Sequence, residues 1–158
     1  MPERLTRYYF RSSWTTTHDP RDLYSALAEL GRYPEWWREV RVAEEVGDGV
    51  FRLECRSLLP YWLRFTSTRA RADEDEGVLE STLAGDLEGY TRWVVWPAPG
   101  GAELVFEEDV VTNKRSLRVL APVARPAFRL NHTLMMRNAR RGLETYMAGY
   151  RLGRADAS

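Results

Sequence analysis

Two ionisable side chains lie at positions where the surrounding pattern predicts apolar residues. Glu108 alternates with Phe106 and Val110 in a segment of period two, so these three side chains share one face of a predicted strand. His132 lies on the apolar stripe of a predicted helix, one turn after Phe128. Burial disfavours the charged form of a carboxylate, and a carboxyl group or imidazole in an apolar site can serve as a general acid or base. Glu108 and His132 are therefore the candidate catalytic residues, and they form a candidate acid–base couple if the fold brings them together.

Each of these residues also has a structural alternative. Glu108 could lie near a sheet edge or pair with an arginine, where its charge is compensated. His132 could donate to a backbone carbonyl or a tyrosine and simply hold the helix on the sheet.

Aromatic residues supply a second candidate set. Buried aromatic rings offer a large apolar area and, with a few hydroxyl groups, suit a flat and partly oxygenated ligand. The interior faces of the predicted elements carry further aromatic rings, Phe10 and Phe51 among them. For any single ring the alternative is an ordinary core, and the pair Trp36-Trp37 could either flank a pocket mouth or pack inside. The candidate ligand-binding residues are Trp14, Tyr61, Phe65, Trp93, Phe106, Phe128, Met135 and Tyr146.

Composition excludes several classes of protein. The 158 residues carry 23 basic and 23 acidic side chains, so the chain lacks the basic excess expected of a nucleic-acid binder. One cysteine and two histidines leave no set for a disulfide or a metal site, and no glycine-rich cofactor loop occurs. We therefore expect no metal and no cofactor, and Cys55 to be a small buried residue. No run reaches the ~20 apolar residues of a membrane span, and no targeting segment is visible, which favours a cytoplasmic location.

The periodicities predict the elements that position these residues. A strand over 8–17 precedes a helix that begins at Pro20, with Asp19 as its cap, and a second short helix over Pro34–Val40. Hairpin signals then separate six strands in an antiparallel meander, and a helix of about 117–150 follows, kinked or split near Pro122 and Pro126. Residues 1–150 form one domain and 151–158 a frayed tail. The six strands are expected near 40–46, 50–58, 62–72, 78–87, 90–96 and 102–112.

Arginines mark the outer face of that last helix. Arg137, Arg140 and Arg141 lie mostly off the apolar stripe. We expect a solvated face there, and contact with anionic lipid headgroups is the alternative.

Four groups of residues carry a resemblance to a known family, namely Tyr33-Pro34-Glu35-Trp36-Trp37, Leu59-Pro60-Tyr61, Gly85-Asp86-Leu87-Glu88-Gly89, and Asn131-His132 with Met136 and Gly142-Leu143. Together with the element order, they resemble the START-like or SRPBCC superfamily of polyketide cyclases/dehydrases and lipid-transport domains. The resemblance implies an α+β helix-grip fold, in which a curved seven-stranded antiparallel sheet wraps around the long C-terminal helix and two short helices follow the first strand. It also implies an apolar cavity between sheet and helix, but it carries no invariant catalytic set.

Three functions remain open on this basis. The first is an enzyme, a polyketide cyclase or dehydratase that binds a lipid-like or aromatic polyketide-like molecule and assists ring closure or water loss by proton transfer. The second is a carrier or sensor that binds a hydrophobic molecule unchanged. The third is a domain whose cavity is filled by side chains and which works through protein contacts. Two inward ionisable groups within hydrogen-bond reach would favour the enzyme, and a wholly apolar lining would favour the carrier or sensor. A cavity volume below about 300 Å³ would favour the domain that works through protein contacts. A weak homodimer is also left open.

Overall fold

The computed structural model describes residues 6–56, 59 and 61–156 of the chain. Three predicted segments are affected by this limit. The described part does not include residues 57–58 at the end of an expected strand, Pro60, or the last two residues of the expected tail. The elements in chain order are β1 Arg7–Thr16, α2 Pro20–Ala28, a 3-10 helix Leu30–Glu35, β2 Val40–Gly47, β3 Val50–Arg56, β4 Trp62–Asp73, β5 Val78–Gly85, β6 Leu87–Ala98, β7 Gly101–Thr112 and α3 Arg115–Asp156.

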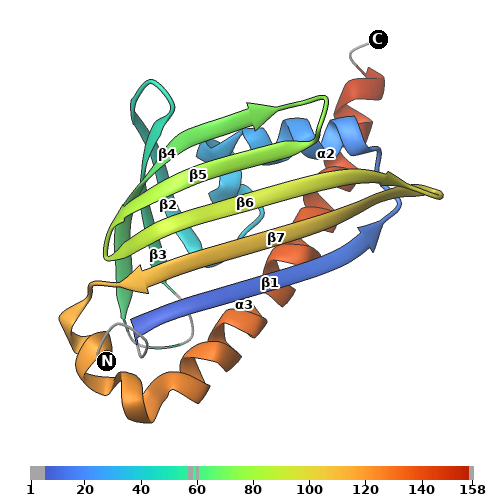
Figure 1. Cartoon of the computed structure of the whole chain (residues 1–158). Coiled ribbons are helices and arrows are strands. Elements are labelled where there is room, and N and C mark those ends of the chain that lie inside the picture. Colours follow the sequence, from blue (N-terminus) through green and yellow to red (C-terminus); the bar gives the residue numbers. More distant parts are fainter. Residues whose placement is uncertain (1–5, 57–58, 60, 157–158) are drawn as a thin grey trace.

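The seven strands form one antiparallel sheet in the order β1-β7-β6-β5-β4-β3-β2. From β2 to β7 each strand pairs with the next one along the chain, whereas β1 pairs with β7. Figure 1 shows the sheet curving around α3, the long helix in orange and red. The predicted α+β architecture, with seven antiparallel strands and a long C-terminal helix, is confirmed.

The first helix begins where the sequence predicts. The Asp19 side chain accepts hydrogen bonds from the backbone N–H groups of Arg21 at 2.9 Å and Asp22 at 3.3 Å, which satisfies two of the free donors at the start of α2.

The second short helix after the first strand is present, but it spans Leu30–Glu35 and the predicted bounds Pro34–Val40 are wrong. A 3-10 helix ends at Glu35, and the residues from Trp36 to Glu39 form a turn instead. Trp36 and Trp37 are both buried and stack with 5.6 Å between ring centroids. In an α-helix consecutive side chains lie about 100° apart, so the two rings would not point into the same core.

The last helix is a single element that contains both prolines. It begins at Arg115, two residues before the predicted start, and extends past the predicted end at residue 150 as far as Asp156. Pro122 and Pro126 do not split it. Figure 1 shows instead that its first turns run in a different direction from the rest and wrap around one end of the sheet. The predicted change of direction is therefore present within a continuous helix.

The middle of α3 packs tightly against the turn that follows the 3-10 helix. A Cβ atom added at Gly142 would overlap the carbonyl oxygen of Trp36, so only glycine allows this approach. Nearby, the Asn138 amide donates to the buried Glu39 carboxylate at 2.7 Å. Apolar side chains of α3 complete the main core on the sheet, namely Met136, Ala139, Leu143 and Met147.

Candidate functional site

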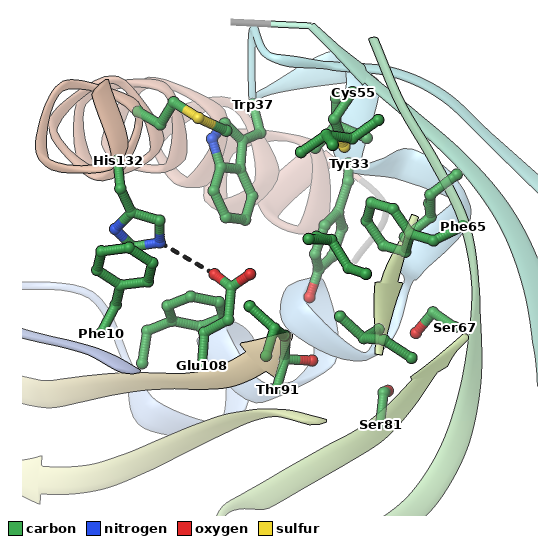
Figure 2. Close-up of a pocket in the computed structure, with 18 of the residues that line it drawn as sticks. Phe10, Tyr33, Trp37, Cys55, Phe65, Ser67, Ser81, Thr91, Glu108 and His132 are labelled. Carbon is green, nitrogen blue, oxygen red and sulfur yellow. Dashed lines mark hydrogen bonds and ion pairs between the residues drawn. The ribbon is translucent and has the colours of Figure 1, made fainter. Parts of the chain in front are cut away.

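A cavity of about 170 Å³ lies between the inner face of the sheet and α3. Figure 2 shows its walls, which come from several strands, the segment after α2, and α3. Most of the lining side chains are apolar, and apolar walls supply most of the binding free energy for a hydrophobic ligand. Six of the predicted ligand-binding residues line it, namely Tyr61, Phe65, Trp93, Phe106, Phe128 and Met135.

The other two predicted ligand-binding residues lie outside the lining. Trp14 points inward as its alternation predicts, but it packs edge-on against Trp93 at 5.9 Å and so supports a lining residue from behind. Tyr146 lies further along α3, near Arg32 and 6.2 Å from the ring of Tyr150. For both residues the sequence predicted the correct face of the element, but it did not predict that the residue lies outside the cavity lining.

Glu108 and His132 meet across the cavity. His132 Nε2 lies 3.0 Å from Glu108 Oε2, and each side chain is only 14% exposed. Glu108 faces inward on β7 between the buried residues Phe106 and Val110, as the period-two pattern predicts. Neither structural alternative for Glu108 applies, because β7 lies between β1 and β6 and the partner is a histidine. In Figure 2 one carboxylate oxygen points to His132 and the other toward the cavity interior.

Phe10, predicted only as one of the aromatic rings on an interior face, is a third member of this group. Its ring stacks on the imidazole of His132 with 3.6 Å between centroids and 7° between planes. Phe10 is also the Cα partner of Glu108 in the pairing of β1 with β7. The ring therefore fixes the plane of the imidazole, while the carboxylate fixes its rotation.

Hydroxyl groups continue across the sheet from Glu108. Thr91 on β6 is the Cα partner of Glu108, and Ser81 on β5 is the Cα partner of Thr91. Both line the cavity, and within the described part of the chain neither hydroxyl has a hydrogen-bond partner. The next position in this row is Arg69 on β4, whose guanidinium donates to the carbonyl of Ala28 at 2.9 Å. The row places one uncommitted hydroxyl group, that of Thr91, on the strand next to Glu108 and a second, that of Ser81, one strand further along the cavity wall.

The aromatic pair before β2 belongs mainly to the core. Trp36 and Trp37 are both buried, and Trp37 also contributes to the cavity wall. Tyr33, which lines the cavity beside them, donates from its hydroxyl to the carbonyl of Leu27 at 2.6 Å, and burial raises the pKa of this hydroxyl. Tyr33 is thus held as a neutral hydrogen-bond donor.

Cys55 lines the cavity but is not an activated nucleophile. Burial, assisted by the negative charges of Glu108 and Glu39, raises the pKa of its thiol to about 12. A thiol must ionise to attack or to bind a metal, so this environment disfavours both. Among the described residues, no group of three or more His, Cys, Asp or Glu side chains could hold a metal ion.

Comparison with known proteins rests on structure. No protein-family model matches the chain, and no curated protein matches its sequence. The Zhui aromatase/cyclase from Streptomyces sp. R1128 aligns with a TM-score of 0.74 at 16% identity, over 90% of this chain and 94% of that one. A START superfamily protein from Mycobacterium smegmatis aligns with a TM-score of 0.69 at 14% identity, over 91% and 98% of the two chains. The chain has the START-like helix-grip fold.

The chain spans about half the length of one larger structure that it matches. The di-domain ARO/CYC StfQ from the steffimycin biosynthetic pathway aligns with a TM-score of 0.70 at 18% identity, over 96% of this chain and 54% of that one. At these identities the likeness concerns the fold, and function must be argued from the site.

Proposed function

We propose that the protein binds a small hydrophobic molecule carrying an oxygen function in this cavity, and that Glu108 and His132 transfer a proton on it. The observation that carries the proposal is a hydrogen-bonded carboxylate–imidazole pair, with each side chain 14% exposed, in a cavity whose lining is mostly apolar. Burying such a pair costs desolvation free energy that apolar residues of similar volume do not cost. A functional role of the pair therefore explains its presence here better than a contribution to the stability of the fold.

The size of the cavity limits the ligand. A volume of about 170 Å³ is close to the roughly 150 Å³ that holds one benzene molecule, so the present cavity accommodates a single substituted ring or a short chain. It is below the roughly 300 Å³ at which small-molecule pockets usually begin, which favours a domain that works through protein contacts. The ionisable pair favours an enzyme. We give the pair more weight, because a core filled for protein contacts alone has no reason to enclose two proton-exchanging groups and free hydroxyls.

The geometry suggests one elementary step. With a ketone bound, the free Glu108 oxygen accepts a proton from the carbon next to the carbonyl. The electron pair of that C–H bond forms a C=C bond to the carbonyl carbon, and the π pair of the C=O bond moves onto the carbonyl oxygen. The Thr91 hydroxyl, on the strand beside Glu108, is a hydrogen-bond donor for the developing negative charge. His132 holds the carboxylate through Nε2 and keeps its second oxygen directed at the ligand. Return of the proton to a different atom completes an enolisation, the step that precedes aldol closure and water loss.

Probes of one ring test binding and chemistry separately. Toluene, phenol and acetophenone match the cavity in size and differ in their oxygen function, and each should raise the melting temperature if it binds the folded state. Exchange of the acetophenone methyl protons for deuterium in D₂O, followed by NMR, reports proton transfer without knowledge of the natural substrate. We expect acetophenone to exchange faster with the protein, and Glu108→Gln to reduce that acceleration roughly a hundredfold.

Glu107→Gln is the matched control, because Glu107 is the neighbouring carboxylate on β7 and pairs with Arg92 at 3.3 Å and Arg11 at 3.6 Å. It should leave exchange unchanged. Binding without accelerated exchange would contradict the catalytic proposal and favour the carrier. No thermal shift with any of the three probes would contradict the binding proposal itself.

A further inference from the structure

We propose that the outer side of the first half of α3 docks on an anionic lipid surface. We call this surface the docking face and define it by the exposed apolar residues Val119, Leu120, Val123 and Leu130 together with the arginines Arg115, Arg118 and Arg129. The inference goes beyond the proposed function and does not require the ligand to be known.

The apolar part of the docking face is unusually exposed. Val119 is 71% exposed, Leu120 54%, Val123 86% and Leu130 61%. They make up four of the seven large hydrophobic residues that are exposed in the described part of the chain. Val119, Val123 and Leu130 are four and then seven residues apart, a spacing that places them along one side of a helix. The result is an apolar stripe in solvent.

The charge around this stripe is positive and uncompensated. From residue 110 to 143 the sequence has eight Lys and Arg and no Asp or Glu, although the whole chain is neutral. Several arginines of the sheet, by contrast, have acidic partners within the fold, as in the pairs of Arg7 with Asp109 and Arg92 with Glu80. Within the described residues, six exposed arginines of α3 form no ion pair, namely Arg115, Arg118, Arg129, Arg137, Arg140 and Arg141. These cations are exposed to solvent and can meet an anionic surface.

These properties fit lipid better than protein. A second copy would oppose the same cations and repel them. A specific protein interface centres on aromatic or arginine anchors seated in pockets, whereas the four apolar residues here are aliphatic and Val123 projects with most of its side chain in solvent. An anionic bilayer requires only aliphatic side chains to enter the boundary of the acyl chains and cations to meet the headgroups. No described helix is long and apolar enough to cross a membrane, so the contact is a surface one.

The inner side of the same segment borders the cavity, where Leu117 and Phe128 are part of its wall. Between them, Pro122 and Pro126 have no backbone N–H, so the helix lacks two of its internal hydrogen bonds at this point. Docking would therefore place a helical part of the cavity wall that lacks two backbone hydrogen bonds against the bilayer. This gives an apolar ligand a path that avoids water, a step that rests on the proposed function.

Vesicle binding of the full chain tests the docking face directly. Co-sedimentation would be measured with vesicles of phosphatidylcholine, with and without phosphatidylglycerol, at low and high salt. We expect binding to the anionic vesicles only, weakened by salt. Val123→Asn with Leu130→Asn should reduce the partition coefficient at least about tenfold, because two aliphatic side chains are no longer buried. Arg118→Gln with Arg129→Gln should reduce it about fivefold for each arginine.

Matched controls lie elsewhere on the chain. Val46 on β2 is 56% exposed, and Arg21 and Arg41 are exposed arginines away from α3. Val46→Asn and the double change Arg21→Gln with Arg41→Gln should not alter vesicle binding. Equal loss in the controls, equal binding to neutral vesicles, or no binding would overturn the proposal. Saturable binding of a polyglutamate peptide without vesicle binding would assign the face to an acidic protein. Probe binding by the docking-face variants without vesicles shows separately whether the cavity still works.

Discussion

Phe10 and Glu108 lie directly opposite each other on β1 and β7, and both contact the same side chain of α3, His132. The imidazole is held on one face by a ring and at Nε2 by a carboxylate. Two neighbouring strands therefore position one helix residue, and the position of the helix over the cavity is linked to the geometry of the candidate site.

Phe10→Leu keeps apolar volume at this position but removes the stacked ring. An aromatic contact is worth about 0.5–1.5 kcal/mol, so we expect exchange of the acetophenone methyl protons to slow roughly three- to tenfold while acetophenone still binds. Phe51→Leu is the control, because Phe51 is a partly buried ring of the core that does not line the cavity. An equal effect of the two substitutions on exchange would show that Phe10 has no positioning role.

Gly142→Ala should destabilise the protein, because the added Cβ would overlap the carbonyl oxygen of Trp36 and force α3 away from the turn. We expect a loss of about 2–4 kcal/mol in the free energy of unfolding, measured by urea denaturation. Gly149→Ala lies in the same helix with nothing within 4 Å of the new methyl group, and it should stabilise by up to about 1 kcal/mol. Similar effects at the two positions would contradict the close approach at Gly142.

Leu79→Ala should enlarge the cavity. Leu79 is buried on β5 and lines the cavity, so its truncation should cost about 2–5 kcal/mol of stability and open space for a second ring. Thermal shift with naphthalene should rise relative to toluene. Leu143→Ala removes a similarly buried side chain of the core outside the lining, and should cost stability without any gain for naphthalene.

Cys55 should resist alkylation in the folded protein. Burial raises the pKa of its thiol from 9 to about 12, which lowers the thiolate fraction at pH 8 about a thousandfold. Labelling with iodoacetamide, followed by mass spectrometry, should be slow at pH 8, accelerate as the pH rises toward 12, and become fast in denaturant. Rapid labelling of the native protein at pH 8 would contradict the burial of the Cys55 thiol.

The sequence predicts the parts of the site that depend on local periodicity. Period two along β7 directs Glu108 inward, and the helical stripe does the same for His132. The register of β1 against β7 cannot be predicted from a local sequence pattern, because the two strands are far apart in the chain. The contact of Phe10 with His132 depends on this register, so the role of Phe10 was missed. Thr91 and Ser81 were missed for a related reason, since their place in one row with Glu108 follows from the pairing of β5, β6 and β7 and not from the local sequence.

The same limit explains the errors. Alternation identifies the face on which Trp14 lies, but the position along the cavity depends on how the curved sheet meets α3. The second short helix ends at Glu35 instead of Val40, and the turn that follows it buries both Trp36 and Trp37.

The pairing of β1 with β7 also has a consequence for how the chain folds. Arg7 and Asp109 are hydrogen-bonded although 102 residues separate them, whereas β2 to β7 can pair through successive hairpins. Closing so long a loop is entropically costly, so contacts between distant segments form slowly. We expect the meander to assemble first and β1 to join afterwards. The contacts of Phe10 with His132 would then be among the last to form, and early folding intermediates would have the sheet without a competent site.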